Sequence, residues 1–309
     1  MRLELDSSSR AFIDLAKTGR RGWQAAVLTI LLVVLLSVLG TSLMLTFTGW
    51  SIYLKHVHLA DVGTTVVSGA ANPLVCIFGL WLACKIILKR PFLSLVSTDL
   101  TFSVRRCFVG AALYLPANLL GIAAMSLYIS MRYGAWTIPL DHFERPAASA
   151  IFAAVVAIIA IPFLAFAEEL FFRGWLTQTI GQHVRMPALA ATLVAVLFAA
   201  FHAQYDLKIK ALMLATSLGL SALCLRDQRL ELAIGAHSTM NICVVLKLLL
   251  FTGPVHHMQV ATTITTYDWI SLALLKGALP LGAMYGVLQI TGGWFSPIEA
   301  LPAKLSASG

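Results

Sequence analysis

The sequence predicts an all-α fold: a polytopic membrane helix bundle of about eight transmembrane helices with a buried active site. The first observation is compositional, because 59% of the 309 residues are hydrophobic, 12% are charged and the mean hydropathy is +0.85. Soluble domains carry about a quarter charged residues. The second is a series of apolar stretches, most of them long enough to cross a bilayer. The third is a set of ionisable side chains inside those stretches, where they are costly and usually functional.

Eight apolar stretches follow one another along the chain, and the short fifth stretch makes the count approximate. They are residues 24–47, 66–88, 103–130, 147–181, 187–204, 208–226, 230–251 and 264–290. No segment between them is polar enough to fold as a soluble domain. We therefore expect one membrane domain over residues 23–309, with a motif-bearing core at about 147–251. A cytoplasmic basic lead over residues 1–22 precedes it.

The formal net charge of +8 does not indicate a nucleic-acid partner, because the lysines and arginines lie mostly in loops between the apolar stretches. With a cytoplasmic N-terminus, many more of them fall in inside loops than in outside loops, as the positive-inside rule requires. The five cysteines lie in or beside apolar stretches and form no Cys-x-x-Cys pair, which is typical of packing residues. We expect a multi-pass integral protein of a bacterial inner (cell) membrane, surrounded by the lipid bilayer, with both termini cytoplasmic.

The fourth stretch carries two adjacent carboxylates, Glu168 and Glu169, followed by Arg173. Glu169 and Arg173 are four residues apart, so they share one helix face and can form an ion pair. Glu168 points roughly 100° away around the helix and needs a partner from another helix. A carboxylate in that position can take up a proton from a reacting group. The alternative is a structural Glu–Arg pair that joins two helices, with a neutral Glu168 beside it.

The fifth stretch ends at His202, and the helical register places this histidine level with the two glutamates. The fourth and fifth stretches are joined by a turn near residues 181–187. Glu168 lies about 16 residues before the turn and His202 about 18 after it, so both lie roughly 25 Å from it. An antiparallel pair of helices would bring Glu168 or Glu169 opposite His202. A general base and an orienting partner could hold a water there, although a lone histidine can also simply bond two helices together.

The seventh stretch carries His237 and Asn241, whose spacing of four places both on one helix face. Both side chains can donate hydrogen bonds, and two convergent donors suit a developing oxyanion. A polar face that joins helices in the bundle is the alternative interpretation.

The three motifs together, in this order, resemble the CAAX prenyl protease and bacteriocin-processing family of intramembrane proteases, also called the Abi family. The local sequence Glu-Glu-Leu-Phe-Phe-Arg-Gly is similar to the Glu-Glu-x-x-Phe-Arg-Gly of that family. The resemblance implies that Glu168 and His202 activate a water that attacks the scissile carbonyl, while His237 and Asn241 stabilise the oxyanion. Glu169 and Arg173 would brace the helix. The resemblance covers about residues 147–251.

An older view of the family makes it a metalloprotease, and Glu168, His202 and His237 could form a His₂Glu zinc site. The motif His-Glu-x-x-His is absent, so we expect glutamate catalysis without a cofactor and keep zinc as the alternative. The buried position predicts a hydrophobic or membrane-tethered peptide or protein as the substrate.

Two functions of other classes stay open. One is a non-catalytic membrane scaffold or bacteriocin-immunity factor that keeps the fold. The other is a small proton-coupled transporter that uses the two glutamates and His202 as a proton relay. The absence of a repeated half in the sequence argues against the transporter.

Overall fold

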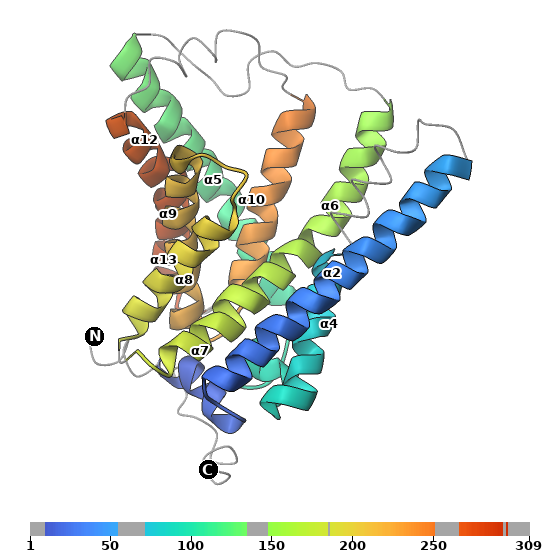
Figure 1. Cartoon of the computed structure of the whole chain (residues 1–309). Coiled ribbons are helices and arrows are strands. Elements are labelled where there is room, and N and C mark those ends of the chain that lie inside the picture. Colours follow the sequence, from blue (N-terminus) through green and yellow to red (C-terminus); the bar gives the residue numbers. More distant parts are fainter. Residues whose placement is uncertain are drawn as a thin grey trace.

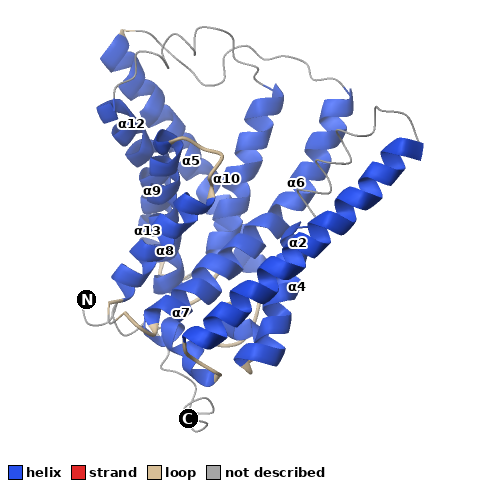
Figure 2. Cartoon of the chain, viewed as in Figure 1, coloured by secondary structure: helices blue, strands red, loops and turns tan. Residues whose placement is uncertain are grey.

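The computed structural model describes residues 10–54, 72–134, 148–184, 186–250, 266–292 and 295, and these form a bundle of helices (Figure 1). The remainder of the predicted lead, residues 1–9, and the C-terminal end lie outside the described residues, and so do parts of the second and last apolar stretches. Helices account for nearly all regular structure in the described part, where the only extended pairing is an isolated bridge between Ser97 and Arg229 (Figure 2). The predicted all-α membrane bundle is confirmed.

Every one of the eight predicted stretches contains a helix. The α-helices that cover them are α2 (Trp23–Leu54), α4 (Asn72–Ala83), α5 (Val104–Tyr133), α6 (Ala148–Glu169), α7 (Thr177–Gly181), α8 (Pro187–Phe201), α9 (Leu207–Asp227), α10 (Glu231–Leu250), α12 (Thr266–Ala273) and α13 (Leu279–Thr291). Three π-helical turns continue or join them: η4 (Cys84–Leu88), η6 (Leu170–Leu176) and η7 (Leu274–Ala278). Two 3₁₀ turns, η1 (Leu15–Thr18) and η5 (Phe92–Leu95), lie in the connecting segments.

Among the described residues, five helical segments are long and apolar enough to cross a membrane, which makes this an integral membrane protein. They are Trp23–Leu43, Val104–Tyr133, Ala154–Gly181, Leu207–Asp227 and Asp268–Thr291. Two shorter apolar helices cover Asn72–Leu88 and Pro187–Phe201. The number of spans therefore stays a prediction, because the shorter helices fall below the length of a full crossing.

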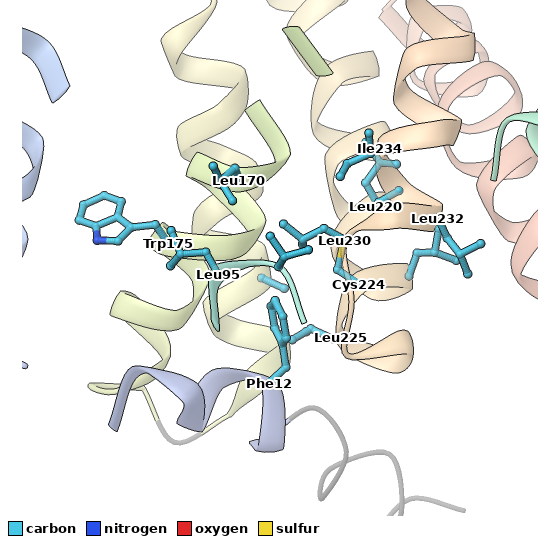
Figure 3. Packing of buried hydrophobic residues seen from close by; sticks show 14 of the residues in the cluster. Phe12, Leu95, Leu170, Trp175, Leu220, Cys224, Leu225, Leu230, Leu232 and Ile234 are labelled. Atoms are coloured by element: carbon cyan, nitrogen blue, oxygen red, sulfur yellow. The ribbon is translucent and has the colours of Figure 1, made fainter. Parts of the chain in front are cut away.

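The outer face of α2 is apolar, as a surface in contact with lipid must be. Helix α2 leaves Leu28, Leu31 and Leu35 exposed along its length. The buried hydrophobic cluster, by contrast, joins the N-terminal lead, η5 and η6 to α9 and α10 (Figure 3). Phe12 of the lead and Trp175 of η6 belong to this cluster. The lead is therefore folded against the bundle from Arg10 onward.

Two close backbone contacts fix the helices that carry the polar residues. Helix α10 lies so near α5 at Gly235 that a Cβ there would come within 1.9 Å of the Cys107 carbonyl oxygen. The π-helical turn η6 also lies close to the connecting segment at Gly174, where a Cβ would come within 2.5 Å of the Leu95 carbonyl oxygen. Small residues permit such approaches between membrane helices, and no larger side chain fits at either point.

Candidate active site

Glu169 and Arg173 form a buried ion pair at the junction of α6 and η6. The Arg173 Nη1 donates to Glu169 Oε1 at 2.9 Å, as their spacing predicts. The two side chains are 0% and 1% exposed. The second guanidinium nitrogen, Nη2, donates to the hydroxyl of Ser217 on α9 at 2.7 Å. The pair therefore ties the motif helix to α9, which no sequence pattern indicated.

The turn directly after Glu169 is a π-helix, which changes the direction of the side chains that follow. η6 runs over Leu170–Leu176, and the hydroxyl of Thr177 donates to the carbonyl of Phe172 five residues earlier. Single π-helical turns inside α-helices are often found at functional sites. Here the π-helical turn carries Arg173 and Gly174, so the ion pair and the close contact with Leu95 are both made from this turn.

His237 on α10 lies between the two glutamates. Its Nδ1 is 2.7 Å from Glu169 Oε1, and its Nε2 is 3.5 Å from Glu168 Oε2. A carboxylate oxygen can only accept, so Nδ1 carries the proton that is shared with Glu169. Nε2 is then the nitrogen that faces Glu168. Glu168 thus receives its predicted partner from another helix, and that partner is His237.

The exposure of the two glutamates differs in the way that acid–base chemistry needs. Glu169 is fully buried and bonded to both Arg173 and His237, so its role is to orient these two side chains. The Glu168 side chain is 22% exposed, and among the described residues the basic group near its carboxylate is His237, whose Nε2 lies 3.5 Å away. Glu168 is therefore the carboxylate that a water or a peptide can reach.

His202 caps the C-terminal end of α8 and is oriented by its own helix. Its Nδ1 lies 2.8 Å from the Phe198 carbonyl oxygen, which can only accept, so Nδ1 carries the proton and Nε2 is left as an acceptor. Among the described residues, no hydrogen bond joins His202 to either glutamate. The structure therefore does not show the predicted direct hydrogen bond between His202 and a glutamate.

The Phe198 ring joins the parts of the site that hydrogen bonds leave separate. Its centroid is 4.7 Å from that of His202 and 6.2 Å from that of His237. The Arg173 guanidinium carbon lies 4.6 Å from the same centroid, within the range of a cation–π contact. The contact between Phe198 and His202 could have been predicted from the sequence, because Phe198 lies one helical turn before His202.

Asn241 lies one turn beyond His237 on α10 and is half-buried. The two residues share a face, as the sequence predicts. Within the described part of the chain, no hydrogen bond uses the Asn241 amide. The side chain is therefore available to a ligand on the same side of α10 as His237.

The zinc alternative can be tested against the donor groups. His202 and His237 each use Nδ1 for a protein partner, so a metal would have to bind both through Nε2 with Glu168. In the described residues, no three side chains of histidine, cysteine, aspartate or glutamate lie together as a metal site would require. These side chains would have to converge before they could hold zinc, and the alternative stays a prediction.

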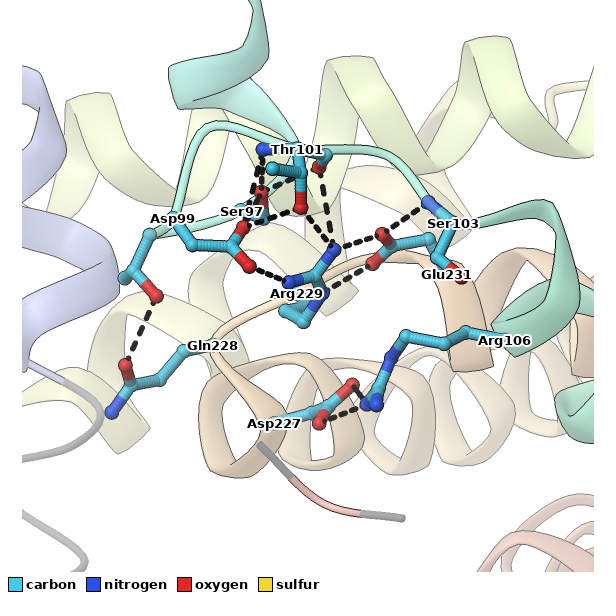
Figure 4. Close-up of polar contacts among 10 residues, drawn as sticks. Ser97, Asp99, Thr101, Ser103, Arg106, Asp227, Gln228, Arg229 and Glu231 are labelled. Atoms are coloured by element: carbon cyan, nitrogen blue, oxygen red, sulfur yellow. Dashed lines mark hydrogen bonds and ion pairs between the residues drawn. The ribbon is translucent and has the colours of Figure 1, made fainter. Parts of the chain in front are cut away.

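A second polar network fixes the start of α10 (Figure 4). Arg229 bonds to Asp99, to the hydroxyl of Thr101 and to Glu231, the first residue of α10. Partial burial would raise the pKa of the Asp99 carboxyl, but hydrogen bonds from Ser97 and Thr101 and the charge of Arg229 together lower that pKa below its usual range. This network holds α10 against the segment before α5.

A second ion pair in the same region joins two helices. Arg106 of α5 contacts both carboxylate oxygens of Asp227, at the end of α9, at 2.6 and 2.7 Å. The pair lies beside the Arg229 network (Figure 4). The ends of α5, α9 and α10 are thereby fixed relative to one another, and with them the height of His237.

Fold and site together define a helical membrane protein with a buried acid–base cluster. Residues 148–243 match the family model described as type II CAAX prenyl endopeptidase Rce1-like. The match contains all six predicted site residues, and it confirms the resemblance to the CAAX prenyl protease and bacteriocin-processing family over this part of the chain.

One curated relative is similar over a comparable length. The uncharacterized protein YyaK of Bacillus subtilis (strain 168) is 33% identical over 129 residues, which are 42% of this chain and 41% of YyaK. The chain thus spans about two-fifths of the length of this relative. No solved structure matches the chain.

Proposed function

We propose that the chain is an intramembrane endopeptidase of the CAAX type, in which a glutamate and a histidine activate water. The observation that carries the proposal is the contact between the reachable carboxylate of Glu168 and His237 at 3.5 Å. The buried Glu169 holds the other nitrogen of that ring. Isolated buried charges are costly, and a partly exposed carboxylate beside an oriented imidazole is an arrangement that suits proton transfer.

Glu168 acts as the general base. It takes a proton from a water whose oxygen bonds to the scissile carbonyl carbon, and the carbonyl electron pair moves to the oxygen. His202 supports the same water through Nε2, since Nδ1 is held by Phe198. When the intermediate collapses, the carbon–nitrogen bond breaks and Glu168 returns its proton to the leaving amine. One carboxylate thus serves both halves of the reaction.

His237 and Asn241 stabilise the oxyanion. Because Nδ1 of His237 donates to Glu169, donation to an oxyanion from Nε2 requires a second proton on the ring. Glu169 supplies the counter-charge for that imidazolium at 2.7 Å. Asn241 adds a neutral donor one turn away. Fixed donors of this kind act without reorganisation when the charge develops.

The substrate is a hydrophobic or membrane-tethered peptide or protein. The cluster lies among helices whose outer faces are apolar, so a polar soluble peptide would lose its hydration on entry. A substrate already held in the bilayer avoids most of that cost.

The deciding experiment compares peptide termini in membranes from cells that express the wild type or Glu168→Gln. The substitution keeps the size of the side chain but removes the base. Asp14→Asn is the matched control, because it makes the same carboxylate-to-amide change outside the site, at a half-buried residue paired only with Lys17 among the described residues. We expect new termini in the wild type and the control that vanish in Glu168→Gln at equal protein level.

The other possible outcomes point to the other functional classes. Identical termini in all three samples, with folded protein, would refute proteolysis and favour a membrane scaffold. Proton-coupled solute uptake by vesicles that depends on Glu168, again without cleavage, would favour the transporter.

A further inference from the structure

A recess opens at the end of the bundle where the N-terminal lead meets α2, η4 and α7. The space between its lining residues is about 350 Å³, part of which is open solvent. Every ionisable side chain in its lining is an arginine or a histidine: Arg20, Arg21, Arg90 and His183. The site proposed for catalysis does not use any of them.

Arg90 forms the buried part of the recess and lacks a counter-charge. Its side chain is only 7% exposed. Nη1 donates to the neutral amide oxygen of Gln178 at 2.7 Å, while Nε has no hydrogen-bond partner among the described residues. Gln178 and the thiol of Cys84 are both neutral partners of this guanidinium. Since a buried charge without an opposite charge is destabilising, this cation makes the recess suitable for an anion.

Arg20 and Arg21 line the recess and are exposed to solvent. The Arg20 N–H donates to the carbonyl of Leu88, the last residue of η4, at 2.6 Å. Neither side chain forms an ion pair with any carboxylate in the described part of the chain. Three arginines thus face one small volume, and a phosphate group is the anion that guanidinium groups recognise best.

The surroundings indicate where the phosphate comes from. Trp23 lies in the chain between the recess-lining residues Gly22 and Ala25 and is 70% exposed, as is typical of aromatic residues at the level of lipid headgroups. Beyond it, α2 presents exposed Val27, Leu28 and Leu31. A lipid headgroup in the recess would therefore have an apolar helix face beside its acyl chains.

We propose that this recess binds the phosphate group of an anionic phospholipid, with Arg90 beneath the phosphate, Arg20 and Arg21 around it and the acyl chains along α2. The bound lipid would fasten the lead to the first helix. This inference does not depend on the proposed peptidase activity.

The test uses the full chain reconstituted in vesicles of phosphatidylcholine and phosphatidylglycerol. The protein is extracted in mild detergent, and native mass spectrometry counts the phosphatidylglycerol molecules that it retains. The variant Arg20→Gln/Arg21→Gln changes two exposed side chains of the recess. The matched control, Lys85→Gln/Lys89→Gln, removes two exposed cations near η4 that do not line the recess.

We expect the wild type and the lysine control to retain phosphatidylglycerol in preference to phosphatidylcholine. Affinity should fall about fivefold for each arginine removed. Equal retention by the arginine variant and the control would overturn the proposal. Added inorganic phosphate separates the two sources of the anion: if inorganic phosphate binds to the wild type and phosphatidylglycerol is not retained, the lipid assignment is wrong. Failure of inorganic phosphate to compete, with lipid retained, supports it.

Discussion

Replacing Arg173 by alanine should destabilise the whole bundle, because Arg173 is the counter-charge of a fully buried glutamate. The guanidinium bonds to Glu169 at 2.9 Å and to the Ser217 hydroxyl at 2.7 Å. It also lies over the Phe198 ring. Alanine would remove all three contacts and leave the Glu169 carboxylate with His237 as its one remaining described partner.

The magnitude follows from these contacts. Removing one partner of a buried ion pair costs roughly 3–5 kcal/mol. Loss of a desolvated cation–π contact adds about 1–2 kcal/mol. The hydrogen bond from His237 to Glu169 survives and offsets part of the loss, so we expect the free energy of unfolding to fall by about 4 kcal/mol.

Unfolding in mild detergent, driven by a denaturing detergent and followed by tryptophan fluorescence, measures this loss, and Trp175 lies fully buried nearby. Two variants serve as controls. Arg173→Lys keeps the charge and should lose less. Glu169→Gln/Arg173→Met removes both charges and should recover much of the stability, because no unpaired charge is left. A loss below about 1 kcal/mol in Arg173→Ala, or a double variant as unstable as the single one, would refute the argument.

Three further results are expected. Asn241→Ala should lower the cleavage rate roughly 10²–10³-fold in a peptide assay if the amide is an oxyanion donor, and full activity would remove that role. Metal chelation should leave cleavage unchanged; a loss that added zinc restores would establish the His₂Glu alternative. The lowered pKa of Asp99 contributes stability that is present at neutral pH and lost as the pH falls below about 4, by less than about 1 kcal/mol because the side chain is 43% exposed. Asp99→Asn should abolish that acid dependence of unfolding, and an unchanged profile would contradict it.

The helices were predictable because a bilayer imposes a simple requirement on sequence. A segment that crosses it must be apolar and must satisfy its own backbone, and each of the eight apolar stretches does contain a helix. The Glu169–Arg173 contact was predictable for a similar reason, since the spacing of four fixes which side chains share a face. The turn between α7 and α8 also falls where the sequence predicts it.

The contacts of His237 could not be predicted, because they depend on how α10 packs against α6. Hydrophobic periodicity gives the face of a helix but neither its height nor its rotation relative to a neighbour. His237 was expected to stabilise the oxyanion or, in the zinc alternative, to bind the metal, and its hydrogen bond to Glu169 was not expected. The π-helical turn after Glu169 could not be predicted from the sequence either, since its composition is that of an ordinary helix.

The glycine contacts have a consequence for how the protein tolerates different membranes. Helices tilt when bilayer thickness changes, which could pull apart two groups that sit on different helices. Here Gly235 lies two residues before His237, and Gly174 lies shortly after the two glutamates, each pressed against a neighbouring backbone. At such contacts no flexible side chain lies between the two backbones, so the spacing between them cannot easily change. In a thinner or thicker bilayer, α10 should therefore move together with α5, and the turn after the two glutamates should move together with the segment at Leu95.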